Sequence, residues 1–253
     1  MQKQPSLNAP KYDCENMRTL LWNVEFGKSP LSVSYLHGLV SSRYYDVVCL
    51  TESTLDFLAG RGNVLRSIGD YGYDDHSGFH QKISLWSRQP WTEIDFEGDR
   101  NLPPGRFLSA VSFGVRFVGV CVPWSKAHVV TGSKSKAMWE DHVTYLKVLK
   151  QVLKRYEVAG QPICVLGDFN QAIPATAWNR KVFPVLMETL GEKFQVWTNG
   201  IVDENEKPLI DHVATSHNLR FTISEIIESK DPEGNRLSDH SGIIGTLSRM
   251  NNC

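Results

Sequence analysis

Short apolar runs recur along the whole chain, and polar segments containing glycine, proline or acidic residues separate them. Short apolar runs that are rich in branched and aromatic side chains predict β-strands. The predicted strands span residues 18–24, 46–51, 81–87, 107–113, 116–122, 162–167, 212–215, 220–227 and 242–247. Strands therefore dominate the expected fold, with helices between some of them.

Two segments show helical spacing of apolar residues instead. Ser29 and Pro30 are typical of a helix cap and first turn, and an apolar face follows them. The clearer helix spans Lys136–Tyr156, where the apolar stripe consists of Val143, Leu146, Leu149, Leu153 and Tyr156. We expect this helix to cover a sheet and to expose its lysines to solvent rather than to nucleic acid.

Length and composition indicate a globular protein with a substantial core. The chain has 253 residues, of which 41% are hydrophobic and 22% are charged. We expect a flexible N-terminal segment over residues 1–16 and a single domain over residues 17–249. The formal net charge of -1 excludes an overall positive field, so any contact with a polyanion must be local.

The cysteines and the apolar runs indicate a cytoplasmic protein. Cys49, Cys121 and Cys164 lie inside apolar runs, where a thiol behaves as a small hydrophobic side chain, and no Cys-x-x-Cys motif occurs. The first residues are polar, and nowhere do about 18 apolar residues follow one another. We therefore expect a reducing compartment and no membrane segment. The sequence offers no basis for naming a protein partner.

Three polar clusters stand at the ends of apolar runs in the last third of the chain. They are Gly167-Asp168-Phe169-Asn170, Ile210-Asp211-His212 and Ser238-Asp239-His240-Ser241. Strand ends bring such clusters to one edge of a sheet. Carboxylates, amides and an imidazole together suit metal-assisted attack of water on a phosphate ester.

With Leu21-Trp22-Asn23 and Thr51-Glu52-Ser53 in front of them, these clusters resemble the endonuclease/exonuclease/phosphatase superfamily. The resemblance extends from residue 18 to about residue 247. It implies an α/β (α+β) fold of the DNase I-like type: a four-layer α/β/β/α sandwich of two packed mixed sheets flanked by helices. Pattern reasoning without the resemblance reaches only α/β or α+β with many strands.

The resemblance also implies a role for each polar residue. Glu52 would be the principal ligand of a Mg²⁺ or Mn²⁺ ion, with Asn23 and Asp239 beside it. Asp168 would position or deprotonate the attacking water, and Asn170 would donate its amide to a phosphate oxygen.

On the far side of the phosphate, the resemblance implies that His240 donates a hydrogen bond to a phosphate oxygen. Asp211 would orient the imidazole and favour its protonated form. His212 follows Asp211 directly, so in a strand its side chain points the other way, and a structural role is favoured.

One position departs from the family pattern. Many relatives carry a His or Tyr that reaches the phosphate on the strand corresponding to residues 116–122, whereas this chain has Cys121 there. A thiol is a weak donor, so transition-state stabilisation would fall by about 2–4 kcal/mol unless another group replaces it. Lys126 and His128 follow in a loop, and either could take this place.

Aromatic and basic residues near the clusters are candidates for substrate binding. They are Trp124, Lys126, His128, Trp178 and Arg180. Lysines neutralise phosphates and an indole stacks on a base, although burial in the core is the commoner fate of tryptophan. The loop Arg100–Arg106, with two prolines, is a third segment that could line a cleft.

These observations favour a divalent-metal-dependent phosphoester hydrolase, most of all a nuclease that cleaves phosphodiester bonds of nucleic acid. The alternative within enzymes is a phosphatase or phosphodiesterase for a small phosphoester such as an inositol phosphate, a nucleotide or a lipid head group. An inactive binding module of the same fold is disfavoured, because all the residues implied in metal binding and catalysis are retained.

Overall fold

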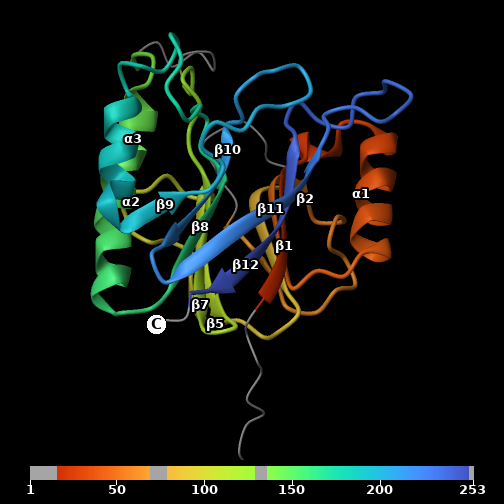
Figure 1. Ribbon diagram of the computed structural model, residues 1–253, viewed down its shortest axis with the longest axis horizontal. Coiled ribbons are helices and arrows are strands. Elements are labelled where there is room, and N and C mark those ends of the chain that lie inside the picture. Colours follow the sequence, from red (N-terminus) through yellow and green to blue (C-terminus); the bar gives the residue numbers. More distant parts are fainter. Residues whose placement is uncertain (1–15, 69–78, 129–135, 251–253) are drawn as a thin grey trace, which may run out of the picture.

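The computed structural model describes residues 16–68, 79–128 and 136–250, and it contains two six-stranded sheets (Figure 1). The strands of the first sheet are, in spatial order, β11 (Leu219–Ile227), β12 (Gly242–Arg249), β1 (Asn16–Asn23), β2 (Val47–Thr54), β4 (His80–Ser87) and β3 (Val64–Arg66). Those of the second sheet are β5 (Thr92–Asp95), β6 (Phe107–Ser112), β7 (Val115–Cys121), β8 (Ile163–Asp168), β10 (Asp211–Ser216) and β9 (Phe194–Val196).

Both sheets are mixed. In the first sheet β1 and β2 are parallel, and in the second β7 and β8 are parallel, whereas the other pairs are antiparallel. The parallel pairs place the C-terminal ends of β1 and β2 at one edge of their sheet and those of β7 and β8 at one edge of theirs. Polar residues that follow these strands are therefore brought together.

The sheets pack face to face through a buried core that includes Leu21, Cys49, Ile83, Phe117 and Leu166. The helix α1 (Pro30–Ser42) covers the outer face of the first sheet. The helices α2 (Glu140–Val158) and α3 (Phe183–Leu190) cover the second (Figure 1). The expected four-layer α/β/β/α sandwich is thus confirmed.

All nine predicted strands are present, with ends shifted by a few residues at most. The three strands that the pattern missed, β3, β5 and β9, have only three or four residues, too few to show a period. Helix α3 was also missed. It has only eight residues and no side-chain cap, so Pro184 in its first turn was the signal that could have located it.

The two predicted helices are found, one with a different start. The side chain of Ser29 caps α1 by accepting a hydrogen bond from the Ser32 backbone N–H at 3.0 Å. Helix α2 begins at Glu140 instead of residue 136, because Trp139 has a left-handed backbone with φ of 69°. The buried stripe of α2 includes Leu146, Leu149 and Leu153, as predicted.

Two short 3₁₀ turns, Glu25–Gly27 and Gly191–Lys193, complete the secondary structure of the described residues. The expected flexible segment of residues 1–16 lies outside the described part of the chain apart from Asn16, which begins β1. Among the described residues, no helix combines the length and the apolar character needed to cross a membrane.

Candidate active site

The polar residues singled out in the sequence meet at one edge of the sandwich. In the second sheet Asp168, the last residue of β8, pairs with Cys121 on one side and with Asp211 on the other. In the first sheet Asn23 ends β1, and His240 lies just before the start of β12. The register of two sheets therefore gathers side chains that are far apart in sequence.

A glycine allows β7 and β8 to approach closely beside the site. Gly167 has φ of 146°, and a Cβ atom there would lie 2.0 Å from the Val120 carbonyl oxygen. Any other residue would push the strands apart or distort the backbone. Gly167 thus fixes the position of the next residue, Asp168.

Asp168 is held by two amide side chains. Its Oδ1 accepts a hydrogen bond from the Asn170 backbone N–H at 2.9 Å, and its Oδ2 accepts from Asn170 Nδ2 at 2.8 Å. Asn23 Nδ2, from the other sheet, donates to the same Oδ2 at 3.2 Å. Asn170 Nδ2 also donates to the Val122 carbonyl at 2.9 Å, so a phosphate oxygen would have to replace one of these acceptors.

The environment of Asp168 favours its protonated form in the absence of a cation. Burial, together with the charges of Asp211 and Glu52, raises its pKa to about 7 despite the opposing charge of His240. A buried carboxylate surrounded by other carboxylates is costly unless a positive charge relieves it.

His240 and Asp211 form a hydrogen-bonded pair, with His240 Nδ1 facing Asp211 Oδ2. Burial lowers the pKa of His240, but the charges of Asp211, Asp168 and Asp239 outweigh it and raise the pKa well above the ordinary value. Trp22 fixes the segment by donating from Nε1 to the His240 carbonyl at 3.0 Å. The ring therefore carries a proton and presents Nε2 towards Asn23, whose Nδ2 lies 3.5 Å away.

His212 has the structural role expected for it. Its Nδ1 lies 2.7 Å from Thr198 Oγ1, and its Nε2 lies 2.8 Å from the Gln171 carbonyl oxygen. The side chain is fully buried, and burial lowers its pKa to about 4. A neutral imidazole with two hydrogen-bond partners ties β10 to the loop after β8.

The first sheet contributes carboxylates that already have cationic partners. Glu52 Oε1 lies 2.6 Å from Lys82 Nζ, and the Lys82 side chain is only 7% exposed. Glu25 accepts hydrogen bonds from both Arg236 and Lys28. The sequence reading missed these cations. Strand β4 mixes polar and apolar residues, so Lys82 does not stand out in its sequence.

Three site residues have left-handed backbones although none is glycine. The φ angles are 46° at Glu25, 49° at Glu52 and 52° at Asn170. Such conformations cost on the order of 1–3 kcal/mol each and persist where the surrounding structure imposes them. Their concentration here is typical of a functional site.

The residues fit a hard divalent cation. Potential ligand atoms of Asp168, Asp211 and His240 lie within 4.8 Å of one another, and the two carboxylates can bind a cation while the His240 ring is protonated. Within the described residues, Asp211 Oδ1 is buried without a hydrogen-bond partner, an acceptor that a cation or its water would satisfy. Burial raises the pKa of Asp211 against the opposing charge of His240, and the negative charges of Asp239 and Glu52, two of the three predicted ligands, raise it further.

Cys121 is no proton donor in this structure. It is buried, and burial raises the pKa of its thiol to about 12. Of the two predicted substitutes, Lys126 is exposed, and His128 Nε2 lies 3.5 Å from Asp141 Oδ2 at the start of α2. A cation that contacts Cys121 is Arg106, whose Nη1 donates to the Cys121 carbonyl at 3.3 Å and lies 3.8 Å from its sulfur.

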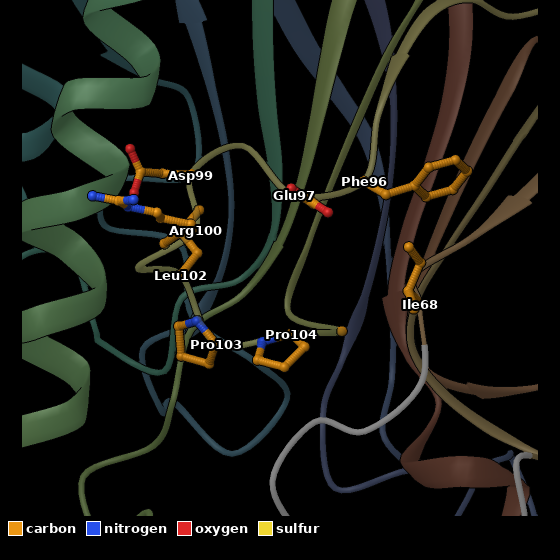
Figure 2. A pocket seen from close by; sticks show the side chains of 9 residues that line it. Ile68, Phe96, Glu97, Asp99, Arg100, Leu102, Pro103 and Pro104 are labelled. Carbon is orange, nitrogen blue, oxygen red and sulfur yellow. The ribbon is translucent and has the colours of Figure 1, made fainter.

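The remaining candidates for substrate binding lie on the surface. Trp178 is 58% exposed and Trp124 is 41% exposed, so neither belongs to the core, and Arg180 is exposed as well. The loop Arg100–Arg106 lines a pocket of about 300 Å³ that contains none of the predicted catalytic residues or metal ligands. The pocket is formed by Arg100, Leu102, Pro103, Pro104 and Gly105 with Ile68, Phe96, Glu97 and Asp99. Figure 2 shows Phe96 and Ile68 on one side of this pocket, and Arg100 and Leu102 on the other.

Comparisons with solved structures agree with this fold. A 3'-5' exonuclease from Neisseria meningitidis superposes with a TM-score of 0.65 at 16% identity, covering 92% of this chain and 99% of that chain. A 3' phosphatase from Neisseria bound to a product DNA hairpin gives the same values. An AP endonuclease from Archaeoglobus fulgidus has a TM-score of 0.63 at 12% identity, covering 90% and 98%. At these identities the likeness shows the fold alone.

No curated protein matches the chain. The model of the endonuclease/exonuclease/phosphatase family matches residues 20–240, which include every predicted catalytic residue and metal ligand. The chain therefore belongs to the endonuclease/exonuclease/phosphatase family, a family of phosphoester hydrolases.

Proposed function

We propose that this protein is a Mg²⁺- or Mn²⁺-dependent phosphodiesterase that hydrolyses nucleic acid, with DNA or RNA as its substrate. The observation that carries the proposal is the arrangement of Asp168, Asn23, His240 and Asp211, which lie in a row across two sheets. Asn23 donates to Asp168, Asn23 Nδ2 lies 3.5 Å from His240 Nε2, and His240 pairs with Asp211. A carboxylate at one end of this row and a protonated imidazole in it can act on opposite sides of one phosphorus atom.

The residues divide the chemistry between them. Asp168, ionised when a cation is bound nearby, accepts a proton from the attacking water and aligns it, while Asn170 and Asn23 keep the carboxylate in place. His240 donates from Nε2 to a phosphate oxygen as negative charge accumulates there. Asp211 holds the ring and stabilises its charge.

Glu52, Asp239 and Asn23 would hold the divalent ion, in reach of Asp211. The ion, when bound, supplies Lewis acidity and neutralises charge on the phosphate. The three described cysteines are buried free thiols, which fits the cytoplasm as the place where we expect the protein to act.

The test is a panel of labelled single-stranded, duplex and abasic DNA, RNA and soluble inositol phosphates, each incubated with Mg²⁺ and with Mn²⁺. We expect cleavage of at least one nucleic acid, and a loss of about 1000-fold or more in Asp168→Asn, because the amide cannot accept the proton. Glu188→Gln, a carboxylate-to-amide change on α3 at a side chain that is 69% exposed, is the matched control.

Hydrolysis confined to the inositol phosphates would overturn the nucleic-acid assignment in favour of a small-phosphoester phosphatase. If no substrate is hydrolysed and neither ion changes the melting temperature, the fold serves as a binding module instead.

A further inference from the structure

Two tryptophans, an exposed Trp178 and a half-buried Trp139, form an aromatic surface beside the site. Trp139 directly precedes α2, and Trp178 lies in the loop between β8 and α3. Their ring centroids are 6.2 Å apart with an angle of 55° between the planes. We refer to these two residues as the tryptophan shelf. Trp178 is 58% exposed, so its ring is open to solvent and free to stack on a ligand.

Both halves of the shelf are fixed by hydrogen bonds. The Trp139 backbone N–H donates to the Ser125 carbonyl at 2.8 Å. Asn179, next to Trp178, is buried and donates from Nδ2 to the Ala172 carbonyl at 2.8 Å, while its Oδ1 accepts from the Thr176 backbone N–H at 2.7 Å. An aromatic surface held in this way loses little conformational entropy on binding.

A buried polar network ties the shelf to the active site. The His142 ring meets Trp139 edge to face at 4.9 Å, and its Nδ1 lies 2.7 Å from the Pro123 carbonyl oxygen. Its Nε2 contacts Gln171 Nε2 at 2.6 Å, and Gln171 Oε1 accepts from Asn179 Nδ2 at 3.2 Å. Because Gln171 directly follows Asn170, the residue that orients Asp168, the shelf has a fixed position relative to the catalytic carboxylate.

The backbone bounds the distance to the site. The Val122 carbonyl accepts from Asn170 Nδ2, and Ser125, which holds Trp139, is three residues further along the chain. At 3.8 Å per residue, the Cα atoms of Val122 and Ser125 are at most about 11 Å apart. The segment that holds Trp139 therefore begins close to the residue that holds Asn170.

The surroundings of the shelf match a nucleotide rather than an apolar ligand. Lys126 and Arg180 are exposed, and each is two or fewer residues from Ser125 or Trp178. Cations beside an indole suit a phosphodiester with its base, because the charges neutralise phosphates and the ring stacks on the base.

We propose that the tryptophan shelf of Trp139 and Trp178 binds an unpaired nucleobase of the nucleotide that flanks the scissile phosphate. Stacking on an indole face tolerates any base, so the shelf favours single-stranded or splayed ends over continuous duplex without reading a sequence. This inference rests on the proposed function and makes it more specific.

The experiment measures binding of two fluorescein-labelled single-stranded oligonucleotides, one complete and one with a single tetrahydrofuran abasic residue next to the labelled end. Ca²⁺ replaces Mg²⁺ to suppress hydrolysis. The wild type should bind the complete oligonucleotide about tenfold more tightly than the abasic one. Trp178→Ala should abolish this difference, and Trp178→Phe should retain part of it.

Tyr44→Ala is the control, because Tyr44 is an exposed aromatic residue near the start of β2, at the other end of the strand that carries Glu52. In hydrolysis assays Trp178→Ala should raise KM with kcat unchanged. If Trp178→Ala keeps the preference for the complete oligonucleotide, the shelf inference fails while the proposed function stands. If the wild type binds neither oligonucleotide, the proposed function itself fails.

Discussion

The two sheets contribute unequal halves to the site, and the halves differ in how their charges are balanced. The first sheet and the turn after β1 supply Glu52 and Glu25, each of which contacts a cationic side chain, Lys82 and Arg236 respectively. The second sheet supplies Asp168 and Asp211, whose partners are neutral amides and the ring of His240.

The pKa directions follow this division. Burial raises the pKa of Glu25, but hydrogen bonds from Arg236 and Lys28 outweigh it and lower the pKa overall. Asp168 has no such cation, and its pKa rises to about 7. The comparison teaches that one half of the site is neutralised by the protein itself, whereas the other holds excess negative charge that a divalent ion relieves.

The largest expected effect concerns the second-sheet half. Asp211→Asn removes the charge that stabilises protonated His240 while keeping nearly the same shape, so kcat should fall by about 1000-fold, which corresponds to about 4 kcal/mol. The measurement is hydrolysis of the best substrate of the panel at saturating Mg²⁺, with circular dichroism to confirm the fold. A loss below tenfold would show that the His240–Asp211 pair is structural.

An effect of intermediate size is expected on stability, and it concerns the buried hydrogen bonds of His142 beside the second-sheet half of the site. Burial lowers the pKa of His142 to about 4, below its ordinary value of 6.5. Its Nδ1–H donates to the Pro123 carbonyl, and its Nε2 accepts from Gln171, so the neutral ring satisfies both partners. Between pH 6.5 and 4, His142 binds a proton in the unfolded chain but stays neutral in the folded chain. The free energy of unfolding should therefore fall as the pH falls, by up to about 3 kcal/mol from this residue.

The check is urea unfolding of wild type and His142→Gln at pH 7.5, 6 and 5. The variant lacks the titrating group but can still donate a hydrogen bond, so its stability should depend less steeply on pH than that of the wild type. His212, whose pKa burial also lowers to about 4, is present in both proteins and cancels in the comparison. Parallel curves would mean that His142 does not resist protonation.

The site residues of the second sheet could be predicted from the sequence because they stand at the ends of apolar runs. Asp168 and Asp211 end and begin strands that pair with each other, so strand prediction alone brings them to one edge. Asn23 is at the end of a strand too. These positions could be predicted because a strand end is a local feature, at which an apolar run gives way to polar residues.

The first-sheet cations could not be predicted in this way. Lys82 lies inside β4, and it reaches Glu52 only because the antiparallel register sets Thr51 opposite Ile83 and Ser53 opposite Gln81. The ion pair of Arg236 with Glu25 joins residues that are 211 positions apart. Such pairings depend on long-range register and loop geometry, which no local period records. Trp139 was missed for the same reason, since a helix was predicted to run through it.

The smallest expected effect, and the sharpest test of the division, concerns Lys82. In the absence of a divalent ion its ammonium group neutralises Glu52 at 2.6 Å, so an ion bound to Glu52 must sit close to a positive charge. Lys82→Met removes that repulsion, and the affinity for Mn²⁺ should rise at least about fivefold, since two unit charges about 4 Å apart interact by about 1 kcal/mol even in water. Electron paramagnetic resonance of free Mn²⁺, without substrate, measures this directly.

Lys82→Arg keeps the charge and should bind Mn²⁺ like the wild type. Without metal, Lys82→Met should melt at a lower temperature because Glu52 loses its partner, and saturating Mn²⁺ should restore most of the difference. Weaker Mn²⁺ binding in Lys82→Met would instead show that the lysine holds Glu52 in the geometry that the ion needs. In that case both halves of the site would depend on the ion in the same way, and the contrast between the sheets would disappear.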